Sequence, residues 1–226
     1  MSPQDRLHSQ GEPAYSHRRV NILREVHLIS RRDLLDHSFY RRWVAGQLSI
    51  DELRDYASQY AHVVAALPKL LRMVALRTPV DAVQLERHAV EEDGHLVLWN
   101  KFAEALGVTA QELAITAPNL ATAEVLRRGD ELTEQPTGAA VAWALEAQTP
   151  AVSVEKLRGL KVHYGIESQS GGEYFDVHSA RDLVHAAELD DLIAGFGSDH
   201  FSAAQCTADA ILDGLWDLLT SVERAS

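Results

Sequence analysis

The stretch SIDELRDYASQYAHVVAALPKLLRMVAL, residues 49–76, decides the fold class of this 226-residue chain. Ser49 and Glu52 form the Ser-x-x-Glu pattern of a capping box, which marks the beginning of a helix. The apolar residues that follow lack the strict alternation of a β-strand over any convincing length. The stretch therefore predicts a long helix and an all-α protein.

The rest of the chain repeats this pattern of helical segments joined by short connections. No linker rich in Ser, Gly or Pro divides it, so we expect one compact helical bundle over residues 17–226, after a polar tail over residues 1–16. The expected helices, besides the one over 49–76, span residues 18–36, 80–92, 96–107, 122–132, 138–148, 151–165, 173–193 and 198–222.

Composition excludes several classes of protein. The chain has 33 acidic and 21 basic side chains and a formal net charge of -12, which disfavours nucleic-acid binding. No apolar run reaches the roughly 18 residues of a membrane span, and the polar start lacks the apolar core of a signal peptide. A single cysteine, Cys206, agrees with a reducing compartment. We therefore expect a cytoplasmic protein without nucleic-acid or membrane partners.

The strongest signal of chemistry is HSARDLVH, residues 178–185. His178, Asp182 and His185 stand at positions i, i+4 and i+7, which share one face of a helix. Two imidazoles and a carboxylate directed at the same point form a metal-ligand set. The alternative is a solvated helix face.

A second cluster lies in HAVEEDGH, residues 88–95. Glu91 and Glu92 precede His95 by four and three residues, and both spacings fit one helical face, so spacing leaves the choice open. Bundles that bind two iron or manganese ions combine Glu-x-x-His pairs with lone Glu residues. His88 lies on the same face, and we interpret it as a supporting or surface residue.

A third contribution is Glu146, an acid inside the apolar helical stretch AVAWALEAQTP, residues 140–150. Burying an unpaired carboxylate costs several kcal/mol, so a bound metal is its simplest partner. Imidazoles and carboxylates without thiolates suit two divalent first-row ions and argue against a structural zinc site. The candidate ligands are Glu91 or Glu92, with His95, Glu146, His178, Asp182 and His185.

Several motifs in order give the chain a family resemblance. HSFYRRW, QLSIDELRDYASQYAHVVAALPKLL, EEDGH, ALEAQTP and YFDVHSARDLVHA resemble the CADD family of heme-oxygenase-like dimetal oxidases and oxygenases, in the wider group of TenA and PqqC. The resemblance covers residues 33–188. It implies a bundle of about seven helices without heme, in which an Fe/Fe or Mn/Fe centre activates dioxygen with an external reductant. The implied ligands are Glu91, His95, Glu146, His178, Asp182 and His185.

The resemblance also implies an activity. CADD-like proteins are 4-aminobenzoate synthases that serve folate synthesis and consume their own side chains. The matching positions here are Tyr40 for the aromatic ring, Lys156 for the amino nitrogen and Tyr174 as a site tyrosine. Leu145 stands where the family has a tyrosine, so a radical-transfer role there is lost or rerouted. The family also points to a homodimer, and the sequence identifies no electron donor.

Two other functions are consistent with the sequence. A metal enzyme of this kind could oxidise an external amino acid or fatty acid by N-oxygenation, desaturation or C–C cleavage, for which Leu145 leaves room. The other alternative is a non-catalytic TenA-like binding or regulatory protein. The acidic composition opposes DNA binding in that case.

Overall fold

A computed structural model of the chain describes Leu28 and residues 31–224. The expected tail over residues 1–16 and most of the expected helix over 18–36 lie outside this part. Where that helix was expected to end, the chain is irregular and then forms the short 3₁₀ turn η1 (Leu34–Asp36). Gln148 accepts a hydrogen bond from the Leu34 amide at 2.7 Å and donates one to the Arg32 carbonyl at 2.6 Å. These bonds hold the segment in a non-helical conformation, so an α-helix reaching Asp36 was wrong.

The described part of the chain consists of helices and connections without a strand, which confirms the all-α class. The helices are α2 (Ser38–Val44), α3 (Ile50–Arg77), α4 (Ala82–Asp93), α5 (His95–Ala105), α6 (Ala110–Ile115), α7 (Leu120–Thr133), α8 (Ala139–Glu146), α9 (Thr149–Gly159), α10 (Glu173–Ala194) and α11 (Ser198–Val222), with the π turn η2 (Leu160–Tyr164) and the 3₁₀ turn η3 (Ser168–Ser170). Short breaks separate α4 from α5 and α8 from α9. None of these helices has the length and apolarity that crossing a membrane requires.

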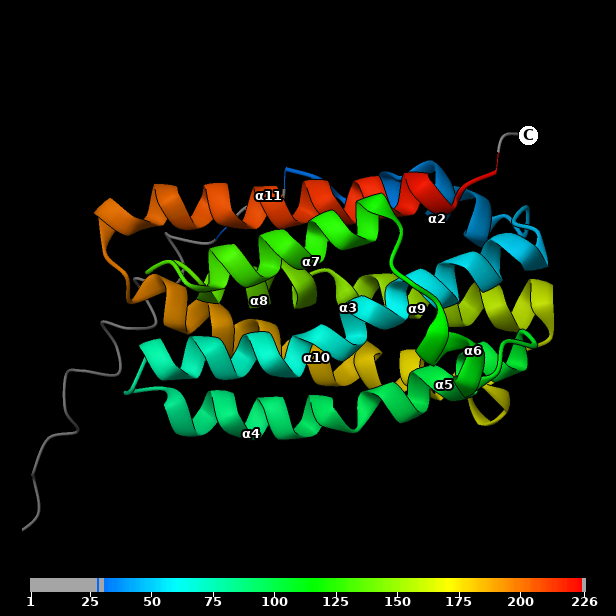
Figure 1. The fold of residues 1–226 in the computed structure, drawn as a ribbon, viewed down its shortest axis with the longest axis horizontal. Coiled ribbons are helices and arrows are strands. Elements are labelled where there is room, and N and C mark those ends of the chain that lie inside the picture. Colours follow the sequence, from blue (N-terminus) through cyan, green and yellow to red (C-terminus); the bar gives the residue numbers. More distant parts are fainter. Residues whose placement is uncertain (1–27, 29–30, 225–226) are drawn as a thin grey trace, which may run out of the picture.

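Helix α8 lies at the centre of the bundle. Figure 1 shows α4 and α5 following one another along one edge of the molecule and α11 along the opposite edge, with α3 and α10 between them. Helix α8 packs against α3, α7, α10 and α11, and all of its residues are buried. Its apolar sequence AAVAWAL suits this position, because a helix that is apolar on every side is stable only when it is buried on every side. Its last residue, Glu146, is thereby fixed in the interior.

Aromatic side chains fill the core where α2, α3, α5 and α10 meet. Trp43, Tyr56, Trp99, Phe102 and Phe175 are completely buried and pack largely edge to face. The indole nitrogens of both tryptophans also form hydrogen bonds. Trp43 Nε1 donates to the Lys156 carbonyl at 3.1 Å, and Trp99 Nε1 donates to the Ala57 carbonyl at 2.8 Å. This packing holds the four helices in fixed positions around the site described below.

A buried glutamate joins α2, α3 and the end of the chain. Glu52 closes the predicted capping box with Ser49, and its carboxylate also accepts a bidentate pair from Arg42 at 2.6 and 3.0 Å and a bond from the Arg224 amide at 3.1 Å. Burial alone raises the pKa of Glu52, but the hydrogen bonds from Arg42 and Ser49 outweigh it and lower the pKa to about 2. The ionised carboxylate therefore fixes α2 against α3.

We expect Glu52→Gln to lower the free energy of unfolding at pH 7 by about 2 kcal/mol, because it removes charge-assisted hydrogen bonds. A carboxylate with a lowered folded-state pKa stabilises the protein above its unfolded pKa and loses this effect as the pH falls. The difference from wild type should therefore shrink between pH 4.5 and about 2. Urea unfolding at pH 7 and pH 3 measures both values. Glu112→Gln is the matched control, because Glu112 closes an exposed capping box with Thr109; equal effects of the two variants would refute the role of Glu52.

Candidate functional site

Helix α10 presents a metal-ligand face to the interior. His178, Asp182 and His185 lie on one face of it, as their spacing predicts, and all three are buried. The ring of His178 is oriented by its Nδ1 atom, which lies 2.6 Å from the Tyr174 carbonyl one turn earlier. This leaves its Nε2 atom directed away from the helix backbone, toward α4.

A second face of the same kind lies opposite, on α4 and the beginning of α5. His88, Glu92 and His95 are also spaced i, i+4 and i+7 and are also buried. The two faces run antiparallel, so their histidines meet in pairs. The ring centroids are 3.6 Å apart for His88 and His185, and 4.3 Å apart for His95 and His178.

Two carboxylates link the paired histidines. Glu146, from the end of α8, has one oxygen 2.8 Å from His88 Nε2 and the other 3.4 Å from His185 Nδ1. Glu92 has one oxygen 2.7 Å from His95 Nδ1 and 3.9 Å from His178 Nε2. The seven residues that form this buried cluster are His88, Glu92, His95, Glu146, His178, Asp182 and His185.

The cluster separates into two groups that share Glu92. Within each group the candidate ligand atoms lie within 4.8 Å of one another. One group comprises His88, Glu92, Glu146 and His185, and the other comprises Glu92, His95 and His178. A carboxylate common to two such groups is the arrangement expected for a pair of ions held close together in a helical bundle.

The polar atoms of the cluster are poorly satisfied by protein partners. Buried atoms without a well-formed hydrogen bond are His88 Nε2, Glu92 Oε1, both carboxylate oxygens of Glu146, His178 Nε2, Asp182 Oδ1 and His185 Nδ1. Such atoms carry a substantial desolvation penalty unless a partner compensates them. These orphaned nitrogen and oxygen atoms point to one place and have the chemistry that iron or manganese ions require. The residues therefore fit a metal centre.

Negative charge accumulates in the same place. Burial raises the pKa of Asp182, and the nearby carboxylates of Glu146 and Glu92 raise it further. Burial also acts to raise the pKa of Glu92, but the nearby imidazole of His178 and the hydrogen bond with His95 outweigh it and hold the pKa below its ordinary value. A divalent cation relieves this repulsion and favours the ionised form of all three carboxylates.

The structure places Glu92, rather than the expected Glu91, inside the buried cluster. Glu92 is 2% exposed and lies inside the cluster, whereas the Glu91 side chain is 27% exposed and forms a 3.0 Å ion pair with Arg181. Glu91 reaches the cluster only at its edge, where it lies 3.2 Å from His185 Nε2. The reason is the buried face of α4, which Leu85, His88 and Ala89 form at helical spacing and which continues to Glu92.

Of the two interpretations of His88, a supporting or a surface residue, the surface one is wrong, since His88 is buried against Glu146. A signal for it was present in the sequence. His88, Glu92 and His95 repeat the spacing of His178, Asp182 and His185. This repetition is visible only when Glu92, rather than Glu91, is taken as the central acid.

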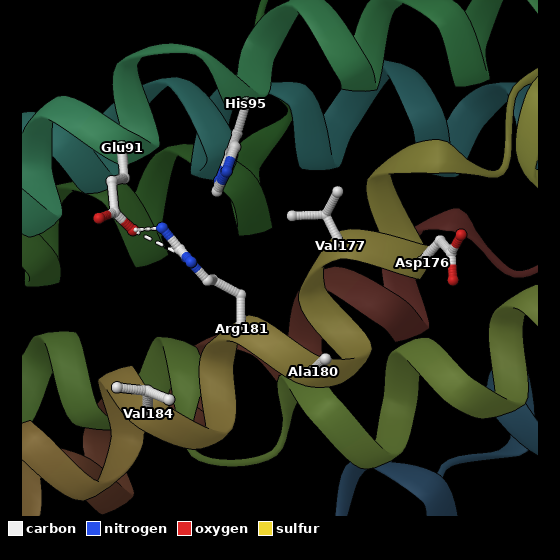
Figure 2. A pocket seen from close by; sticks show the side chains of 7 residues that line it. All are labelled: Glu91, His95, Asp176, Val177, Ala180, Arg181 and Val184. Atoms are coloured by element: carbon white, nitrogen blue, oxygen red, sulfur yellow. Dashed lines mark hydrogen bonds and ion pairs between the residues drawn. The ribbon is translucent and has the colours of Figure 1, made fainter.

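A groove open to solvent leads to the cluster. Figure 2 shows it between α10 and the α4–α5 edge, with the His95 ring directed into it and Glu91 paired with Arg181 across it. The other residues that line it are Asp176, Val177, Ala180 and Val184. His95 is thus the member of the cluster that faces this route from solvent.

Lys156 lies in a second buried site, formed by α2, α3, α9 and α10. It is 4% exposed, and its Nζ atom lies 4.9 to 6.0 Å from the centroids of five aromatic rings. This aromatic cage consists of Tyr40, Trp43, Tyr56, Tyr60 and Phe175. Lys156 Nζ donates a 2.5 Å hydrogen bond to the Tyr56 hydroxyl. Burial lowers the pKa of Lys156 well below its ordinary value, which favours the uncharged amine.

The structure brings Tyr40 and Lys156 together, although they are far apart in the sequence. Lys156 Nζ lies 5.1 Å from the centroid of the Tyr40 ring, and Tyr40 is buried. Burial raises the pKa of Tyr40, with a further contribution from Tyr60, so its phenol stays protonated. The cage residues Tyr56 and Tyr60 were not among the predicted site residues, although their four-residue spacing places them on one face of α3.

Tyr174 lies between the buried cluster and the aromatic cage. Its ring stacks on His178 with centroids 3.9 Å apart and meets Trp99 edge to face at 4.8 Å. Two small pockets adjoin here: one contacts Glu146, His178 and Asp182, the other contacts Tyr40 and Lys156. Both are lined by Tyr60, Leu145, Thr149 and Tyr174. Leu145 therefore lies on the boundary between the two sites.

Solved structures share the fold at low sequence identity. A TenA homologue from Pseudomonas syringae pv. tomato str. DC3000 superposes with a TM-score of 0.75 at 15% identity, over 96% of this chain and 99% of that one. A CADD-like protein of unknown function from Nostoc punctiforme PCC 73102 has a TM-score of 0.65 at 18% identity, over 92% of this chain and 94% of that one. These similarities confirm the expected heme-oxygenase-like bundle.

Sequence comparison extends over most of the chain. The 4-aminobenzoate synthase of Chlamydia pneumoniae is 32% identical over 205 residues, covering 85% of this chain and 90% of that protein. The 4-aminobenzoate synthase of Nitrosomonas europaea is 31% identical over 219 residues, covering 87% of this chain and 88% of that protein. Residues 54–216, which carry the buried cluster, match the family described as iron-containing redox enzymes. Because this match includes most of the bundle, the chain belongs to that family of iron-containing redox enzymes.

Proposed function

We propose that this protein is a non-heme dimetal oxygenase that makes 4-aminobenzoate for folate synthesis from its own Tyr40 and Lys156. The observation that carries the proposal is the buried Lys156 amine, which lies 5.1 Å from the centroid of the buried Tyr40 ring in a cage beside the cluster. The names of its relatives support the product. Membership of a redox family supports the oxidative chemistry.

The ligands of the proposed centre are Glu92, His95, Glu146, His178, Asp182 and His185. Their imidazoles and carboxylates suit an Fe/Fe or Mn/Fe pair without heme. Such ions, once reduced by an external donor, would supply the chemistry that activates dioxygen, the proposed co-substrate. The three carboxylates balance the positive charge of the ions.

The carbon skeleton of the product fits Tyr40. In 4-aminobenzoate a carboxyl carbon stands where tyrosine has Cβ, and an amino group stands where tyrosine has its phenol oxygen. The aromatic cage holds Lys156 Nζ near this ring, and burial lowers the lysine pKa, which favours the amine with a free electron pair. A protonated lysine has no such pair, so the apolar surroundings keep Lys156 competent to donate its nitrogen.

Tyr174 and Tyr60 connect the two sites in this proposal. Tyr174 stacks on His178, and Tyr60 faces both Lys156 and the carboxylates of the cluster. Burial raises the pKa of both phenols, so each keeps its proton until it is oxidised. These tyrosines would take over the radical-transfer role, for which the side chain of Leu145 has no suitable group.

Isotope labelling tests the source of the product. Protein labelled in the tyrosine ring and at lysine Nε, reacted aerobically with iron and reductant, should yield 4-aminobenzoate that carries both labels. Intact-mass and peptide analysis should show loss at Tyr40 and alteration at Lys156. Labelled Tyr40→Phe should form no labelled product. Unlabelled 4-aminobenzoate from a chain of unchanged mass would contradict the proposal.

The adjacent glutamates provide a matched test of the metal centre. We expect Glu92→Gln to lose most of the bound iron, because Glu92 belongs to both groups of candidate ligands. Glu91→Gln should keep close to the wild-type amount, because Glu91 pairs with Arg181 at the edge. Iron per chain after anaerobic loading and removal of free metal gives the comparison. The opposite order would restore Glu91 as the ligand.

One observation favours a second function. The groove that ends at His95 would admit a small molecule from solvent, as an enzyme acting on an external amino acid or fatty acid requires. Tyr40→Phe separates this function from self-consumption, since an enzyme with an external substrate should keep its turnover. Membership of a family of redox enzymes argues against a purely non-catalytic role.

We further propose that the protein works as a cytoplasmic homodimer, as a single domain over residues 17–226. The net charge of -12 supports the absence of nucleic-acid partners, and the single cysteine agrees with a reducing compartment. Sedimentation of the purified protein tests the dimer.

A further inference from the structure

We propose that His88 is an additional metal ligand, so that each of two ions is held by one histidine from each of two antiparallel ligand faces. This inference rests on the metal centre of the proposed function and deepens it. His88 and His185 would hold one ion, together with Glu146. His95 and His178 would hold the other.

The position of His88 is the first observation that supports its role as a ligand. Its side chain is 2% exposed, and its Nε2 atom lies 2.8 Å from Glu146 Oε1 and 3.9 Å from Glu92 Oε1. The same atom is buried without a well-formed hydrogen bond, and so are the facing oxygens of both glutamates. A nitrogen and several oxygens that face one another unsatisfied in a buried space are the donor set of a cation.

The second observation is the antiparallel pairing of the ligand face on α4 and α5 with the ligand face on α10. His88, Glu92 and His95 face His185, Asp182 and His178 in reverse order, so the ring of His88 stands against His185 as that of His95 stands against His178. In the proposed arrangement His185 and His178 are ligands of different ions. The same relation assigns His88 to the ion of His185, and His95 to the ion of His178.

The arrangement is symmetric in its histidines but not in its acids. Glu146 comes from α8, which reaches only the end of the cluster occupied by His88 and His185. The group at that end therefore has two imidazoles and two carboxylates, and Asp182 Oδ1 lies 3.9 Å from His185 Nδ1 at the same end, whereas the other group has two imidazoles and the shared Glu92. The two positions differ in charge, so we expect them to bind iron with different affinities.

Two variants distinguish ligation from support of Glu146. His88→Ala removes both the ligand and any contact with Glu146, whereas His88→Gln can still donate a hydrogen bond to Glu146 but is a poor ligand for iron. The matched control is His200→Ala, because His200 is exposed on α11. Each protein is loaded anaerobically with ⁵⁷Fe(II), washed free of unbound metal and examined by iron analysis and Mössbauer spectroscopy.

Wild type and His200→Ala should retain about two ions per chain with two distinct Mössbauer signals. Both His88 variants should bind one ion at least about 10- to 100-fold more weakly, the range for loss of a group that only supports a ligand, and should lose or shift one signal only. Circular dichroism establishes folding, and His88→Gln carries the test if His88→Ala does not fold.

Three results would overturn the inference. Unchanged iron content, affinity and spectra in both variants would show that His88 is not a ligand. Recovery of the second ion in His88→Gln but not in His88→Ala would make His88 a positioning residue for Glu146. A wild-type protein that binds no iron would instead refute the metal centre itself, which separates failure of the proposed function from failure of this inference.

Discussion

Three carboxylates enclosed in a helical core are the constraint on which the structure depends. Glu92, Glu146 and Asp182 are buried, and their ion-pair partners in the described part of the chain are all histidines. Enclosing so much negative charge without compensation is strongly unfavourable. The helices nevertheless hold these groups together, because α8 is apolar on every side and leaves its final glutamate no path to the surface. The fold thus maintains a space that a pair of cations completes.

The aromatic cage beside the cluster encloses a buried base instead of buried acids. Lys156 is a base in an interior without an acid beside it, and aromatic rings surround it. Burial lowers the pKa of Lys156 and so favours loss of its proton. A cluster rich in carboxylates and a largely aromatic site therefore adjoin, with Tyr174 and Leu145 on the boundary. In the proposed reaction only a few side chains would separate the oxidising metal centre from the Lys156 amine.

Much of the architecture could be predicted from the sequence, because it depends on local rules. Ser49 and Glu52 mark the beginning of α3 by capping, and the spacing of His178, Asp182 and His185 needs only a regular helix. The spacing to His95 did not distinguish the two glutamates, whereas the buried face of α4, with Leu85, His88 and Ala89, continues to Glu92. The choice therefore depended on which face of this helix is buried, and not on the spacing to His95.

Other features depended on contacts between distant segments. The cage around Lys156 combines side chains from three helices, α2, α3 and α10, around a lysine from a fourth, and no local pattern brings these together. The irregular segment before α2 is held by Gln148, more than a hundred residues away, against a local helical tendency. His88 is an intermediate case. Its spacing could be seen in the sequence, but its position against His185 depends on how α4 packs against α10.

The burial of Tyr40 has a consequence for the life of the molecule. Its ring packs against Phe39 and the cage, so its loss in the proposed reaction would leave a cavity in the aromatic core. Truncation of a buried aromatic side chain costs about 3 to 5 kcal/mol, a large share of the roughly 5 to 15 kcal/mol that keeps a domain folded. A spent chain would open more often and be more readily degraded by cellular proteases. The supply of product would then follow the rate at which new copies are translated, and each used copy would return its amino acids to the cell.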